Sequence, residues 1–179
     1  PYEYMTALLS SVYTFSDKVS LYINECKRMG MPVLQPNVNR SLANFSIATE
    51  DDKKVICYGL SAIKNVGEGA VESIVAANHE APFTSLSNFC QRVDLKQVNK
   101  RVIESLIKSG AMDELGTRSY LLQISDRIIE HAQIVEKERR NGQVCLFGGD
   151  SSKMFGVIEE DPHEEQYESF SNIQKLAME

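Results

Sequence analysis

The sequence predicts a mainly α-helical fold with a small β-hairpin and a flexible, acidic C-terminal tail. Apolar residues recur at helical spacing through most of residues 1–140, and one stretch near residue 50 instead shows two apolar runs around a polar turn. Residues 1–140 carry 17 Lys and Arg against 17 Asp and Glu, whereas residues 141–179 carry 2 against 8. The net charge of −6 therefore comes from the tail, and a neutral body can still present a basic face.

Two short helices are expected at the start of the chain. The apolar face of the first consists of Tyr4, Met5, Leu8, Leu9 and Val12. The second can begin at Ser16 or Asp17, since both are natural N-caps, and it ends at Gly30. Residues 31–36 contain two prolines and cannot continue as a helix, so an extended crossover should follow.

The middle of the chain predicts a hairpin and then a series of helices. Residues 44–48 and 54–60 flank the polar turn 49–53 and should pair as a β-hairpin. From residue 60 to about 140 the pattern is nearly all helical, with Gly-, Pro- or Asp-containing breaks at 65–67, 81–83, 93–95 and 109–111. The last helix should run from about Arg118 to Arg140. Residues 148–168 are acidic with few apolar anchors, which predicts a flexible linker.

The composition argues against a membrane span and a zinc site. No apolar run approaches the roughly 20 residues that cross a bilayer. The four cysteines form no C-x-x-C pair, so we expect buried, reduced thiols and a cytoplasmic protein; they are Cys26, Cys57, Cys90 and Cys145. Because the chain begins at Pro1 without a signal segment, we expect a piece of a longer protein.

Residues 60–74 predict two short helices that meet at a turn with little side-chain bulk. Asn65 tolerates a positive φ, and Gly67 and Gly69 have no Cβ to keep a ligand away. The amides that open the second helix lack partners within it and lie at its positive dipole end, so a phosphate can bind there beside a lysine. The candidate phosphate site comprises Lys64, Asn65, Val66, Gly67, Glu68 and Gly69.

This turn also has a purely structural interpretation, in which the glycines only let two helices pack closely. Glu68 and Glu72 would oppose a phosphate unless they point away. A second helix-turn-helix unit is expected from residues 86–92 and 98–109. Three cations precede or open its second helix, namely Lys96, Lys100 and Arg101. They lie near the helix N-terminus, the positive end of the dipole, where a cation is unfavourable. Their placement indicates either a second phosphate face or a solvated basic edge.

Long segments of the chain resemble the alpha (polymerase) subunit of bacterial DNA polymerase III. The match includes PYEYMTALL at residues 1–9, YINECKRMGMPVL at 22–34 and YGLSAIKNVGEGA at 58–70. It continues at residues 17–19, 36–39, 93–95, 98–102 and 106–111. The resemblance implies that residues 1–58 are the end of the fingers region, and that residues 59–141 are a tandem helix-hairpin-helix module gripping primer–template duplex DNA.

The hairpin departs from the family pattern in one place. The family's turn reads G-h-G, where h is hydrophobic, and Asn65 stands here in place of the first glycine. Asparagine can still adopt the left-handed conformation that such a turn requires.

The tail, residues 142–179, carries a second matching element, QVCLF at residues 143–147. It resembles the family's clamp-binding peptide, which implies the beta sliding clamp as a partner, with other replicase subunits binding regions outside this chain. A flexible peptide can bury Leu146 and Phe147 in an apolar groove while the Gln143 amide hydrogen-bonds at its rim. A hydrophobic anchor that folds back on the body is the alternative.

The sequence shows no convincing set of carboxylates for phosphoryl transfer. Asp51 and Asp52 lie in the expected hairpin turn, and the acids of residues 159–165 lie in the tail, so solvated charge explains both. The resemblance implies that the catalytic aspartates and their Mg ions belong to a palm domain of the parent polymerase, and that these 179 residues hold no cofactor. The competing interpretation is a protein–protein adaptor whose hairpins are structural.

Overall fold

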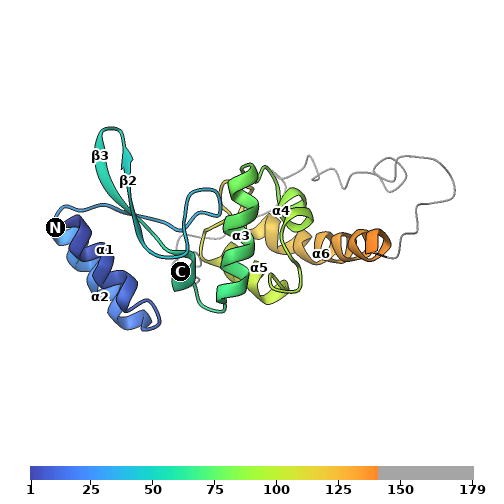
Figure 1. Cartoon of the computed structure of the whole chain (residues 1–179), viewed down its shortest axis with the longest axis horizontal. Helices are drawn as coiled ribbons and strands as arrows, with labels where there is room; N and C mark the ends of the chain where they lie inside the picture. Colours follow the sequence, from blue (N-terminus) through green and yellow to red (C-terminus); the bar gives the residue numbers. More distant parts are fainter. Residues whose placement is uncertain (141–179) are drawn as a thin grey trace.

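A computed structural model of the chain describes residues 1–140 and confirms the mainly α-helical fold (Figure 1). The helices are α1 (Tyr2–Ser11), α2 (Ser16–Arg28), α3 (Glu68–Glu80), α4 (Leu86–Arg92), α5 (Lys100–Lys108) and α6 (Arg118–Arg140), with a 3-10 turn, η1 (Leu60–Ala62). The strands are β1 (Val33–Leu34), β2 (Ser46–Glu50) and β3 (Lys53–Cys57). In Figure 1, α1 and α2 lie side by side at one end of the molecule and α6 extends toward the other.

The predicted β-hairpin is present, but it belongs to a three-stranded sheet with the order β1-β3-β2. β2 and β3 pair antiparallel, and both turn residues have positive φ, 48° at Asp51 and 60° at Asp52, which is the pattern of a type I′ turn. The crossover is extended as expected. It also contributes β1, which pairs parallel to β3 with Val33 opposite Ile56.

The described chain has two hydrophobic clusters. The smaller joins α1, α2 and the sheet, and its buried members are Met5, Leu9, Val19, Cys26, Met31, Phe45 and Ile56. The larger runs from η1 through α3, α4 and α5 to α6. Tyr58 packs against both clusters, and its ring centroid lies 4.8 Å from that of Phe45. This tyrosine therefore lies where the two packed bodies meet.

The crossover is attached to the helical body by specific polar contacts. The Val38 N–H donates to the Ala111 carbonyl at 2.9 Å. The Asn39 side chain accepts from the Phe83 N–H at 2.7 Å and donates to the Phe83 carbonyl at 3.0 Å. These bonds satisfy backbone groups on two loops at once, and they hold α2 and β1 in a defined place beside the helices.

Three of the four cysteines, Cys26, Cys57 and Cys90, are buried and unpaired, as expected, while Cys145 lies outside the described residues. Burial raises the pKa of these thiols, and for Cys90 to about 12.

Within residues 1–140 no helix combines the length and apolar character that a membrane span requires. The same residues bring no three potential metal ligands together. The predicted acidic linker at 148–168 also lies outside the described residues.

Candidate nucleic-acid interface

The first hairpin connects η1 to α3 through residues 63–67. The sequence predicted a short helix before the turn, and the structure has only the single 3-10 turn of η1 there, because the backbone becomes extended at Ile63 (φ −78°, ψ 127°). Asn65 adopts φ 66°, so the expected left-handed conformation is present. Val66 is buried in the larger cluster and anchors the turn; its side chain is not available to a ligand.

The start of α3 is open to solvent. Gly67 is the N-cap and has no side chain that could cap the helix. The first backbone hydrogen bond of α3 runs from the Val71 N–H to the Gly67 carbonyl. The amides of residues 67–70 have no hydrogen-bond partner among the described residues, as expected at a helix start. By contrast, Ser85 caps α4 and Asn99 caps α5 with side-chain oxygens. Among the helices of the two hairpins, α3 is therefore the one whose first amides are all left without a capping side chain.

The two glycines of this turn have different surroundings. A Cβ built on Gly67 meets no atom within 4 Å, so this face of the turn is open. A Cβ on Gly69 would lie 2.5 Å from Oε1 of Gln97. The Gln97 side chain belongs to the second hairpin and packs directly over Gly69. Gly67 thus leaves room for a ligand, whereas Gly69 makes room for a neighbouring side chain. The sequence showed no sign of this contact.

The charged groups near the turn are exposed. Lys64 has no ion-pair partner among residues 1–140, and neither do Glu68 and Glu72. Glu68 lies in the first turn of α3, where a carboxylate interacts favourably with the helix dipole. Lys64 therefore offers a free positive charge beside the open amides. The negative charges of Glu68 and Glu72 weaken the attraction of this site for an anion.

The second hairpin is formed by α4 and α5, as predicted. Its three candidate cations differ in their surroundings. Lys100 Nζ lies 2.7 Å from an Asp126 carboxylate oxygen on α6, and this hydrogen-bonded pair raises the lysine pKa. Lys96 and Arg101 are exposed and have no ion-pair partner within the described chain. Lys100 is thus partly neutralised, and the other two remain available.

The two hairpins form one unit. The Asn65 side chain donates to Ser105 Oγ on α5 at 3.2 Å, and the Asp94 N–H donates to Ser73 Oγ on α3 at 2.8 Å. With the Gln97–Gly69 contact, these bonds link the turn of each hairpin to the other hairpin. The open start of α3 is consequently held in a fixed position relative to α5.

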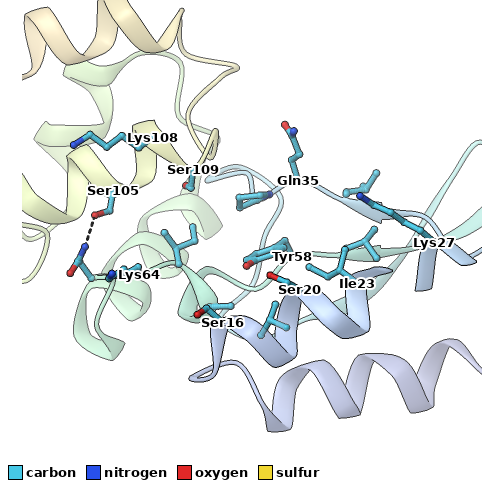
Figure 2. A pocket seen from close by; sticks show the side chains of 17 residues that line it. Ser16, Ser20, Ile23, Lys27, Gln35, Tyr58, Lys64, Ser105, Lys108 and Ser109 are labelled. Carbon is cyan, nitrogen blue, oxygen red and sulfur yellow. Dashed lines mark hydrogen bonds between the residues drawn. The ribbon is translucent and has the colours of Figure 1, made fainter. Parts of the chain in front are cut away.

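A groove lies next to the first hairpin, between α2 and α5 (Figure 2). It brings together Lys27, Lys64 and Lys108, of which sequence reasoning had identified only Lys64. These lysines come from three separate elements, so no local pattern could have grouped them. The predicted clamp-binding residues, Gln143, Leu146 and Phe147, lie outside the described residues.

Comparison with known proteins places this geometry in a family. The model of the family described as "Helix-hairpin-helix motif" matches residues 30–121. The DNA polymerase III subunit alpha of Campylobacter jejuni is 36% identical over 174 residues, 97% of this chain and 14% of that protein. The corresponding subunit of Vibrio cholerae is 40% identical over 165 residues, 92% of this chain and 13% of that protein.

A third subunit shows the same relationship. The DNA polymerase III subunit alpha of Thermus aquaticus is 43% identical over 148 residues, 82% of this chain and 12% of that protein. This chain thus spans about one seventh or less of the length of these relatives. With its paired hairpins and open helix start, the chain belongs to the DNA polymerase III alpha-subunit family and carries that family's helix-hairpin-helix motif.

Proposed function

We propose that this chain holds the backbone of primer–template duplex DNA without reading its base sequence. The observation that carries the proposal is the uncapped start of α3 at Gly67, where four amides lack partners among the described residues and Lys64 is unpaired. A phosphate oxygen can accept from these amides and gain from the helix dipole. Such contacts position a duplex but do not distinguish bases.

The second hairpin supplies a weaker contact to the same duplex. Lys96 and Arg101 are free to approach a phosphate, whereas Lys100 must first give up part of its interaction with Asp126. Asn99 already occupies one amide at the start of α5, that of Val102. We therefore assign the main contact to the first hairpin and a supporting, purely electrostatic role to the second.

The parent protein, on this proposal, is a DNA-directed DNA polymerase that works in the cytoplasm with Mg ions. Its catalytic carboxylates belong to a palm domain outside these 179 residues, so this piece alone has no polymerase activity. Support comes from the relatives, which are all DNA polymerase III alpha subunits of much greater length. Other replicase subunits would bind those further regions.

The tail peptide at residues 143–147 is proposed to bind the beta sliding clamp. Its support is the sequence alone: two adjacent apolar residues after a glutamine, in a segment with few other apolar anchors. This tether would keep the polymerase near its template while the hairpins hold the duplex.

Fluorescence anisotropy with a labelled blunt duplex tests duplex binding. Gly67→Val should weaken binding about tenfold, roughly 1.4 kcal/mol, because the new side chain fills the open face. The fold should survive, since Gly67 has φ −79° and no atom within 4 Å of a built Cβ. Ala76→Val is the matched control, because it adds a β-branched side chain at an exposed position further along α3.

Salt dependence separates this proposal from the adaptor alternative. Lys64→Ala should lower the slope of log K against log salt by about 0.9, the value for one lost phosphate contact with duplex DNA. If folded Gly67→Val and Lys64→Ala proteins bind duplex like the parent, or if the parent shows no salt-sensitive binding, the hairpins are structural and the proposal fails.

A further inference from the structure

The groove beside the first hairpin has the size of a small-ligand site. It encloses about 550 Å³ and is lined by one face of α2, by β1 and by the C-terminal half of α5. Figure 2 shows Ser16, Ser20, Ile23 and Lys27 on one side, Ser105 and Lys108 on the other, and Tyr58 between them. A volume in the range of about 300–1,000 Å³ is typical of sites for small ligands, and one nucleotide is of this size. A duplex is too wide to enter.

The charge of the groove is positive. Its described lining contains Lys27, Lys64 and Lys108 and neither Asp nor Glu. Lys108 Nζ lies 3.8 Å from Glu104 Oε2, and this ion pair partly neutralises the lysine. Lys27 and Lys64 have no ion-pair partner within residues 1–140. Like charges around one concavity repel one another, and they raise the local concentration of anions. The complementary ligand is therefore anionic.

Hydroxyl groups line the same space. Ser16 and Ser20 project from α2, and Tyr58 lies at the centre, where it is half-buried against Phe45. Burial raises the pKa of Tyr58, so its hydroxyl stays protonated and can donate a hydrogen bond. A phosphate oxygen accepts from both hydroxyl and ammonium groups, which is the donor set found here.

The groove adjoins the proposed duplex contact. Lys64 and Asn65 belong to the hairpin turn and also line the groove, so a strand can pass from one to the other without leaving the protein. We propose that the groove holds a single-stranded segment of the nucleic acid whose duplex part is bound at the hairpin. This inference rests on the proposed function, because the strand enters from the duplex held at Gly67.

Two labelled probes test the inference with the 179-residue chain: a single-stranded oligonucleotide and a blunt duplex of the same length. Lys27→Ala should weaken single-strand binding by up to about fivefold, the value of an exposed ion pair. It should also lower the slope of log K against log salt by about 0.7, the value for one lost single-strand contact. Blunt-duplex binding should stay unchanged, because Lys27 lies on α2, at the opposite end of the groove from Lys64 of the hairpin turn (Figure 2).

Lys18→Ala is the matched control, since it removes the same charge from the same helix at an exposed position that does not line the groove. Ser20→Glu provides a second variant, which places a carboxylate inside the groove and should impair single-strand binding more than Lys27→Ala. The inference is overturned if Lys18→Ala and Lys27→Ala have equal effects, if Lys27→Ala weakens both probes alike, or if the parent does not bind the single strand. If one of these outcomes is found and Gly67→Val still loses duplex binding, only the groove inference fails and the proposed duplex function stands. If Gly67→Val binds the duplex like the parent, the proposed duplex function fails as well.

Discussion

Asn65 and Ser105 are linked across the two hairpins by a hydrogen bond of 3.2 Å, in which the Asn65 amide donates to the serine hydroxyl while its own backbone holds φ at 66°. Residue 65 therefore has two roles, a left-handed turn and a cross-hairpin contact. Glycine, the residue at this place in the family pattern, can fulfil only the first. The asparagine keeps the turn and adds a connection to α5.

The turn geometry predicts how substitutions at Asn65 rank. Asn65→Gly should change the free energy of unfolding by less than about 1 kcal/mol, because glycine accepts the positive φ and only an exposed hydrogen bond is lost. Asn65→Val should cost about 1–2 kcal/mol more, since a β-branched residue is strained in this region. Urea denaturation followed by circular dichroism measures both.

Ser105→Ala is the control, because it removes the hydrogen bond and leaves the backbone of residue 65 unchanged. Equal stability of Asn65→Gly and Asn65→Val proteins would show that residue 65 does not have a left-handed backbone.

Gly59 predicts a large effect from one added methyl group. A Cβ there would lie 2.6 Å from the Asn44 carbonyl carbon and 2.7 Å from the Phe45 nitrogen, and neither backbone atom can move freely. Gly59→Ala should therefore reduce stability by about 1–3 kcal/mol, as overpacking does. Thermal unfolding would detect the change as a clear drop in Tm.

Gly67→Ala adds the same methyl group where nothing lies within 4 Å, so the cost should stay below about 1 kcal/mol. A Gly59→Ala protein as stable as Gly67→Ala would mean that residues 44–45 do not approach residue 59 as described.

The elements that follow from local signals were predictable. The helix at Arg118–Arg140 was expected from its apolar stripe, and α2 from its N-cap and its terminal glycine. β1 was not predicted as a strand, because two residues carry no periodicity and the pairing with β3 depends on distant residues. The predicted helix before Asn65 reduced to η1, since its few residues are governed by packing into the larger cluster.

The candidate site was predictable in its chemistry but not in its contacts. Lys64, Asn65 and Gly67 followed from residue type alone, because a left-handed turn, an open helix start and a cation are local properties. The pairing of Lys100 with Asp126 and the cover of Gln97 over Gly69 join residues 26 or more positions apart, and only the fold brings them together. The cationic groove has the same origin.

The pair formed by Arg118 and Asp113 predicts a difference between two neighbouring acidic residues. Arg118 is 5% exposed, and its Nε and Nη2 each donate to Asp113 at 2.9 Å. Asp113→Asn should reduce stability by about 1–3 kcal/mol; this is below the cost of breaking a fully buried pair, because the aspartate is partly exposed. Glu114→Gln removes a carboxylate that is equally exposed but faces the exposed Arg40, so its cost should stay below about 1 kcal/mol. Similar losses for both variants in urea denaturation would contradict a special role for the buried arginine.

The tail peptide predicts that clamp binding and duplex binding can be separated. Residues 141–179 contain almost none of the periodic apolar stripe of the sequence, so removing them should shift Tm little and leave duplex binding unchanged or tighter, as net negative charge is lost. Replacing Leu146 and Phe147 together by Ala should abolish binding to the bacterial sliding clamp, because each side chain contributes roughly 1.5–3 kcal/mol when buried.

Cys145→Ser is the matched control within the same peptide, and its effect should be mild because the position between the glutamine and the apolar pair need not be buried. Calorimetric titration of the clamp into each protein gives the affinities, and anisotropy with the blunt duplex shows that the hairpins are intact. Undiminished clamp binding by the double variant would assign Leu146 and Phe147 to a hydrophobic anchor on the body instead, and a matching fall in Tm on deleting residues 141–179 would confirm that assignment.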